Sequence, residues 1–183
     1  MDKATGTLDR AAFVSRFGGV YEHSAWIAEL AFDQGVLPEF LIANAGGAQL
    51  RSVDEAHALG ASLAGVLSQS SEEQKLALIR AHPDLVGRAA LAGELTGEST
   101  DEQASAGLDH CSSEELARFQ SANAMYRERF GFPFILAVRG RDRAGILSVF
   151  EQRLNNDPAT EFRTALQEID RIALLRLEAL VGV

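Results

Sequence analysis

Apolar residues recur every three or four positions along most of this chain, the spacing that places them on one face of a helix. The clearest case begins with Leu116, Phe119 and Ala122 and continues toward Phe130, which predicts one long helix. The same periodicity predicts helices near residues 11–16, 24–32, 59–67, 76–80, 142–154 and 159–181.

Helix starts are marked by Ser followed three residues later by Glu. This is the capping box, in which each side chain satisfies a backbone amide of the first helical turn. Four such pairs are present, so four helix starts are expected there: Ser52/Glu55, Ser70/Glu73, Ser99/Glu102 and Ser112/Glu115.

One apolar run, residues 132–138, has no helical period. Gly131 and Pro133 interrupt the preceding helix pattern, so we expect a buried extended segment here. No alternating strand pattern, internal repeat or linker-like stretch accompanies it. The sequence therefore predicts an all-α fold, a single-domain bundle of about eight helices over residues 1–183.

Composition narrows the functional classes. The 183 residues are 46% hydrophobic and 23% charged, as in soluble globular proteins, and the net charge of −9 disfavours nucleic acid and anionic membranes as partners. No apolar run reaches the roughly 18 to 20 residues that span a bilayer, and Met1–Lys3 do not resemble a signal peptide. The single cysteine, Cys111, excludes an internal disulfide and argues against a structural zinc site. A cytoplasmic location is expected.

The first candidate for chemistry is His82, which directly follows a predicted helix and precedes Pro83. Proline restricts the backbone of the residue before it, so the imidazole would be held at a fixed angle on a helix-ending turn. The alternative is a surface histidine that only caps the end of the helix.

The second candidate is the segment 99–103, which follows a Gly- and Ala-rich loop over residues 87–97. Long loops often shape pockets, and amides at a helix start bind anions. The alternative is that Ser99 and Glu102 form only a capping box.

The third candidate is Arg176 in the last predicted helix. It shares helical spacing with Ile169, Ala173 and Leu180, so its guanidinium leaves from the apolar face. A charge in that position needs a partner. An internal ion pair and a bound substrate are both compatible with the sequence.

These segments, taken together, resemble the 2-oxo-4-hydroxy-4-carboxy-5-ureidoimidazoline (OHCU) decarboxylase family, whose members convert a product of urate oxidation to (S)-allantoin. The likeness covers nearly the whole chain, because its segments keep the family's order and separations. The residues that carry it are 17–26 (FGGVYEHSAW), 82–85 (HPDL), 99–103 (STDEQ), 106–108 (AGL), Asn123, Tyr126, 129–134 (RFGFPF), Arg176 and Leu177.

The resemblance implies a homodimeric decarboxylase with neither metal nor organic cofactor, because the electrons left by departing carbon dioxide delocalise within the substrate. It implies that His82 and Glu102 are catalytic and handle the protons. The substrate-binding positions it implies are Pro83, Ser99, Gln103, Phe134, Ile135 and Arg176. The ending Val-Gly-Val differs from the peroxisomal signal of some relatives, which favours the cytoplasm. Functional coupling to 5-hydroxyisourate hydrolase is a further expectation.

Two other interpretations stay open at this point. The chain could be a relative that acts on another ureido compound, since a fold does not fix a function. It could also be a non-catalytic helical dimerisation module. The catalytic interpretation requires His82, Glu102 and Arg176 to face one small cavity.

Overall fold

A computed structural model describes residues 8–42, 48–87 and 93–182, and it confirms the all-α class. Within these residues it contains nine α-helices, one 3-10 helix and no strand. The middle of the loop over residues 87–97 lies outside the described residues. The elements are α1 (Arg10–Phe17), α2 (Trp26–Asp33), α3 (Glu39–Ile42), α4 (Val53–Gln69), α5 (Glu72–Ala81), α7 (Gly97–Ser105), η1 (Leu108–His110), α8 (Ser113–Phe130), α9 (Arg143–Arg153) and α10 (Pro158–Ala179).

Two of the four predicted helix starts are confirmed. Ser112 and Glu115 form a complete capping box at the start of α8, with each side chain bonded to the other residue's amide. Ser52 caps α4 by accepting from the Glu55 amide. The Glu55 carboxylate there accepts from the amide of Arg51.

The other two predicted starts are wrong. At α5 the reciprocal pair is Ser71 and Gln74, one residue later than predicted, and Ser70 ends α4 instead. At α7 the cap is Thr96, whose hydroxyl accepts from the Ser99 amide at 3.2 Å. Ser99 is therefore inside the first helical turn. The capping-box interpretation of Ser99 and Glu102 is therefore wrong, because neither residue is at the N-cap position of α7.

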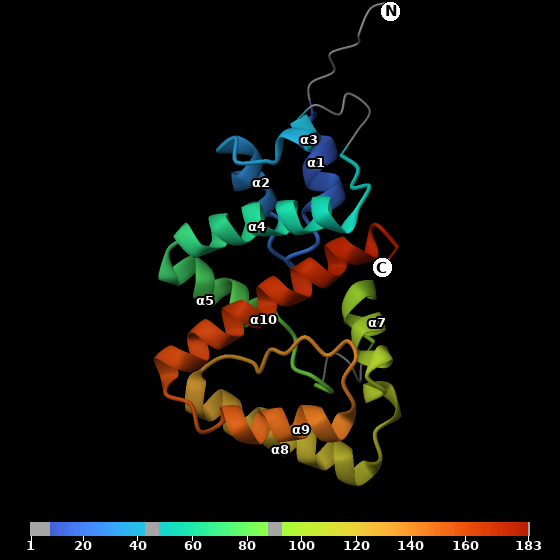
Figure 1. Cartoon of the computed structure of the whole chain (residues 1–183). Helices are drawn as coiled ribbons and strands as arrows, with labels where there is room; N and C mark the ends of the chain where they lie inside the picture. The colour runs from blue at the N-terminus through green and yellow to red at the C-terminus, as the bar shows by residue number, and fades with distance from the viewer. Residues whose placement is uncertain (1–7, 43–47, 88–92, 183) are drawn as a thin grey trace, which may run out of the picture. The chain divides into compact units, whose positions relative to one another are not determined.

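The described chain divides into two compact units, with boundaries inside α5 and α10. The first comprises residues 1–75 and 170–183, apart from those not described. In it α4 packs against α2 (Figure 1). The final turns of α10 also contact α4, because a Cβ on Gly60 would lie 3.2 Å from a Leu174 methyl group, and the imidazole of His57 lies 2.7 Å from the Glu178 carboxylate.

The second unit comprises residues 76–169, and α8 and α9 pack against each other within it (Figure 1). Its core is aromatic: Tyr126 meets Phe134 and Phe150 edge to face, and the rings of Phe134 and Phe150 stack with centroids 3.6 Å apart. Residues 132–138 belong to no helix and are buried throughout, which confirms the predicted buried, non-helical segment. Aromatic packing therefore holds an irregular stretch of backbone inside a helical unit.

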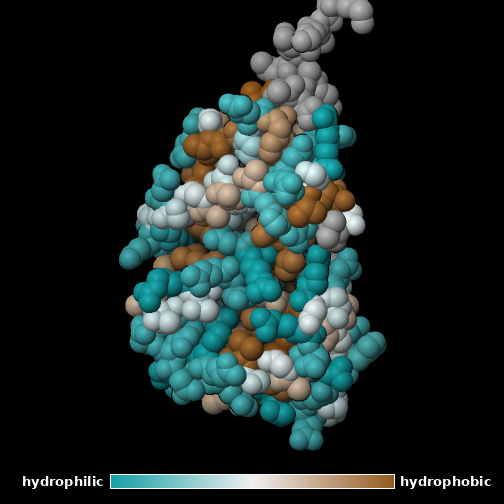
Figure 2. Space-filling model, in the orientation of Figure 1, coloured by the Kyte–Doolittle hydropathy of each residue, from teal (hydrophilic) through white to brown (hydrophobic). Residues whose placement is uncertain are grey.

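Hydrophilic residues cover most of the face seen in Figure 2, with hydrophobic residues scattered among them. Such single apolar residues are ordinary on a protein surface. Among the described residues, no helix combines the length and the apolar character needed to cross a bilayer.

Candidate active site

His82 directly follows the last residue of α5, and it is buried, with 6% of its surface exposed. Its Nδ1 lies 3.0 Å from the carbonyl oxygen of Leu78. A carbonyl oxygen only accepts, so Nδ1 carries the hydrogen, and in the neutral ring the lone pair is on Nε2. His82 thus does cap the end of a helix, but from a buried position. The interpretation as a surface histidine is wrong.

The chain turns sharply just after His82. The Gly87 amide donates to the Asp84 carbonyl oxygen at 3.2 Å, which closes a four-residue turn. Its third residue, Val86, has a φ of 52°, in the left-handed region that β-branched residues rarely occupy. Gly87 is required for space, because a Cβ there would lie 2.7 Å from the Asp84 Cβ. We call residues 82–87 the His82 turn.

Side chains from two helices hold the His82 turn. Asn123 of α8 donates from Nδ2 to the Leu85 carbonyl oxygen at 2.8 Å. The Val86 amide donates to Gln103 Oε1 of α7 at 3.1 Å. At the surface, Arg127 Nε donates to both oxygens of Asp84 at 3.0 Å. The strained turn is therefore fixed by hydrogen bonds from neighbouring side chains, in addition to the backbone hydrogen bond that closes it.

Three predicted site residues lie on α7. Ser99 and Gln103 are buried, while Glu102 is partly exposed. Residues three and four apart share a helix face, so the three side chains leave α7 on one side. Gln103 is therefore both a predicted substrate-binding residue and a residue that supports the His82 turn. Pro83, in that turn, is partly exposed.

The extended segment 132–138 contributes Phe134 and Ile135, both buried. Arg153 of α9 donates from Nη1 to the Ile135 carbonyl oxygen at 2.6 Å, and its guanidinium lies over the Phe134 ring, 4.5 Å from the centroid. The amide of Ala137 donates to the Glu168 carboxylate at 2.8 Å. The amides of Ile135 and Leu136 make no hydrogen bond to any described residue.

A buried ion pair supports that segment. Arg153 donates from Nη2 to Glu161 Oε1 at 2.5 Å and from Nε at 2.8 Å. Both residues are buried, and the Tyr126 hydroxyl donates to the same carboxylate oxygen. Burial, together with the hydrogen bond to Glu161, raises the pKa of Tyr126. The phenol therefore stays protonated and remains a donor to Glu161.

Arg176 belongs to the first unit, whereas the other predicted site residues belong to the second. Its guanidinium is buried and lies 3.4 Å from the carboxylate of Glu22, which is also buried. This is the internal ion pair that the sequence left open. Whether Arg176 also meets a substrate beside His82 and Glu102 remains a prediction.

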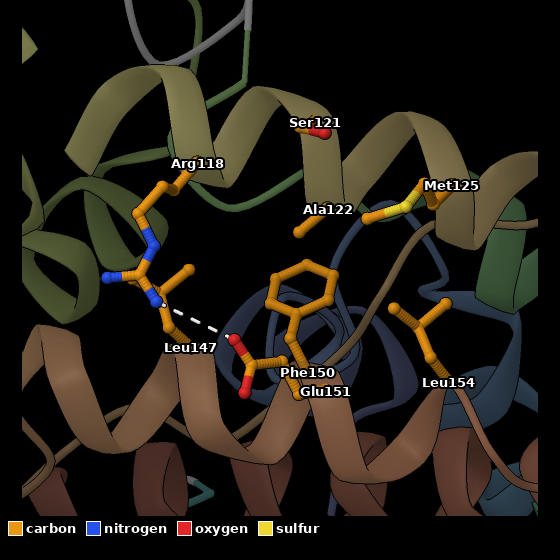
Figure 3. A pocket seen from close by; sticks show the side chains of 8 residues that line it. All are labelled: Arg118, Ser121, Ala122, Met125, Leu147, Phe150, Glu151 and Leu154. Atoms are coloured by element: carbon orange, nitrogen blue, oxygen red, sulfur yellow. Dashed lines mark ion pairs between the residues drawn. The ribbon is translucent and has the colours of Figure 1, made fainter. Parts of the chain in front are cut away.

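The described residues line two open pockets in the second unit. One, of about 180 Å³, lies between α8 and α9, where Arg118 and Glu151 form an ion pair at 3.6 Å across an apolar floor (Figure 3). None of the predicted site residues lines it. The other, of about 370 Å³, is bordered by Gln103, Thr100 and Cys111 among others. No cluster of three potential metal ligands occurs in residues 8–42, 48–87 and 93–182.

Two residues with site contacts were given no site role by sequence reasoning, although Asn123 is among the residues that carry the family resemblance. Asn123 lies between Phe119 and Tyr126 on the buried face of α8, and Arg153 follows Phe150 on the buried face of α9. Both residues could have been detected in the sequence. A polar residue on the apolar face of a helix is unusual and indicates a specific contact. The same argument identified Arg176.

Comparison with known proteins gives concordant findings. The sequence pattern of the OHCU decarboxylase family matches residues 6–178. The chain is 42% identical to the 2-oxo-4-hydroxy-4-carboxy-5-ureidoimidazoline decarboxylase of Haloferax volcanii over 93% of this chain and 89% of that protein. It is 31% identical to a uric acid degradation bifunctional protein of a Bacillus species, over 96% of this chain and 31% of that protein. Its fold is similar to the crystal structure of an (S)-allantoin synthase, with a TM-score of 0.69 and 30% identity, over 95% of this chain and about half (51%) of that one.

Proposed function

Because the chain belongs to the OHCU decarboxylase family, we propose that it decarboxylates 2-oxo-4-hydroxy-4-carboxy-5-ureidoimidazoline to (S)-allantoin in urate degradation. The observation that carries the proposal is the buried imidazole of His82, whose Nδ1 is bonded to the Leu78 carbonyl oxygen. A fixed ring with its lone pair on Nε2 is suited to accept and return one proton in a set direction.

The chemistry follows from the substrate. Its carboxylate and hydroxyl share one ring carbon, and the ureido group is on the next. When the bond to carbon dioxide breaks, its electron pair forms a double bond between these two carbons. The electrons of the ring C=N bond pass to the ring nitrogen, which takes up a proton, and the intermediate is an enol. The hydroxyl then becomes a carbonyl, and a proton adds to the carbon that bears the ureido group. The product contains every atom of the substrate except those of carbon dioxide.

In this proposal His82 and Glu102 carry the proton transfers. Addition of the proton from one face makes the product chiral, so the rigid placement of His82 sets its handedness. Positioned acid-base groups of this kind typically contribute about 10² to 10⁴ in rate. Ser99, Gln103 and the backbone of residues 134–135 orient the ring, with Pro83 beside them.

Arg176 completes the proposed site. It would bind an anionic or carbonyl oxygen of the substrate through its planar fork of donors. In this proposal Glu22, which already faces Arg176, orients that fork.

The first test is His82→Ala. We expect the protein to fold but to lose the excess of (S)-allantoin over the other enantiomer, because spontaneous decay of the substrate gives racemic product. Circular dichroism of allantoin made from fresh substrate measures this directly. His110→Ala is the matched control, since His110 is exposed, and it should retain the parent rate. Full activity of folded His82→Ala would reject the assignment, and Glu102→Gln tests the second group in the same way.

The proposal extends to the setting of the enzyme. A homodimer in the cytoplasm is part of it, and sedimentation velocity tests the dimer. Coupling to 5-hydroxyisourate hydrolase is proposed as well. The bifunctional Bacillus relative supports coupling in general terms, because its name places two activities of uric acid degradation in one chain.

A further inference from the structure

One peptide group in the His82 turn is held at both of its ends by side-chain amides. It is the peptide that joins Leu85 to Val86. Its carbonyl oxygen accepts from Asn123 at 2.8 Å, and its N–H donates to Gln103 at 3.1 Å. Asn123 and Gln103 are buried and come from two different helices, α8 and α7. This peptide cannot rotate without losing both hydrogen bonds.

The orientation of this peptide decides the type of turn. Rotating the central peptide of a four-residue turn interconverts the type I and type II forms. Type I gives the third residue a negative φ, whereas type II gives it a positive φ and usually requires glycine. The third residue here is Val86, at a φ of 52°. The turn has therefore taken the form that its own sequence disfavours, and the two amides account for the choice.

Asn123 has a second property that its packing does not explain. It is 6% exposed, and its Oδ1 has no hydrogen-bond partner among the described residues. An unpaired buried acceptor is unfavourable. Leucine has nearly the same shape and would leave no such acceptor on α8. The presence of asparagine at this position is better explained by its hydrogen bond to the Leu85 carbonyl group.

We propose that Asn123 is a positioning residue for His82 and Gln103. By holding the Leu85 carbonyl group, it keeps the Val86 N–H directed at Gln103 Oε1. Since that oxygen is occupied, the Nε2 group of Gln103 is the end that donates to the substrate. The inference rests on the proposed roles of His82 and Gln103, and it concerns only how they are held.

The experiment combines Asn123→Leu with Val86→Gly. We expect Asn123→Leu to lower kcat/KM by about tenfold or more and to lower the enantiomeric excess of allantoin, because the turn relaxes toward the form that valine prefers. Glycine adopts a positive φ without strain. Adding Val86→Gly should therefore recover most of the lost kcat/KM and enantiomeric excess. A residue that served packing alone would show no such rescue.

Val86→Ala is the matched control, because it removes similar apolar contacts but does not favour a positive φ. The inference is overturned if Val86→Ala rescues Asn123→Leu as well as Val86→Gly does, or if Asn123→Leu keeps the parent kcat/KM. Should Asn123→Leu fail to fold, Asn123→Asp removes the same donor in nearly the same shape. His82→Ala in the same assay separates the two proposals. If it is inactive while Asn123→Leu is fully active, only this inference fails.

Discussion

The His82 turn and the extended segment 132–138 are both irregular stretches of backbone in the second unit, but they are held by different chemistry. The turn is fixed mainly by neutral side-chain amides, those of Asn123 and Gln103. The extended segment is fixed by charged groups, with Arg153 bonded to the Ile135 carbonyl oxygen and to Glu161. Removing one neutral partner leaves an unpaired polar group, whereas removing one partner of a buried ion pair leaves an uncompensated charge, which costs more.

The difference suits the proposed tasks of the two segments. The extended segment offers backbone donors to the substrate, which need a fixed position and no chemical change. The His82 turn surrounds a group that gains and loses a proton. Neutral supports leave the local charge to the proton-transfer groups, because an additional buried charge would alter their pKa values. Three substitutions test the difference between the two segments.

The largest effect is expected for Arg153→Met. It leaves the Glu161 carboxylate buried without its cation, which should lower the free energy of unfolding by about 3–5 kcal/mol. Urea unfolding followed by circular dichroism measures it. The double variant Arg153→Met/Glu161→Leu removes both charges and should regain most of the loss. A loss below about 1 kcal/mol in the single variant would show that the Glu161 carboxylate does not depend on Arg153 for its stability in the core.

An intermediate effect is expected for Gly87→Ala. The new Cβ would lie 2.7 Å from Asp84 Cβ and 3.0 Å from the Asp84 carbonyl oxygen, so the turn must shift, at a cost of about 1–3 kcal/mol in unfolding free energy. Gly97→Ala is the control, because its Cβ would meet nothing within 4 Å. Equal stability of the two alanine variants in the same urea titration would contradict a tightly packed turn.

The smallest effect is expected for Asp84→Asn. The ion pair of Asp84 with Arg127 is partly exposed, and such pairs contribute about 0–1 kcal/mol. Salt screens it, so the difference from the parent protein should shrink between low and high ionic strength. The loss in Arg153→Met should hardly change over the same range. If both variants responded equally to salt, the distinction between the exposed and the buried pair would be wrong.

The helical architecture was largely predictable from sequence. Periodic apolar residues located α8 and α10 to within a few positions, and Gly131 with Pro133 located the extended segment. The helix starts were less predictable, because neighbouring residues compete for the cap. Ser70 and Ser71 are adjacent, and each is followed three residues later by Glu or Gln, so local sequence did not separate them. Thr96 likewise precedes Ser99 as an equally suitable cap.

The sequence predicts a set of candidate site residues, but it did not predict how the backbone around them is held. Local patterns singled out His82 and the segment 99–103, and the family resemblance implied the roles of His82, Glu102 and Gln103. Neither the left-handed Val86 nor the bond from its amide to Gln103 follows from local propensity, because valine disfavours that conformation and only contacts across the unit impose it. The prediction that Arg176 joins His82 and Glu102 around one cavity is still to be tested.

The bond between His82 and the Leu78 carbonyl group makes the length of α5 important for the proposed active site. Each residue of an α-helix turns the chain by about 100°, so inserting or deleting a single residue between Leu76 and Pro83 would swing the imidazole to another side of the helix. The stretch from Leu78 to His82 therefore has to keep its length if the imidazole is to keep its position.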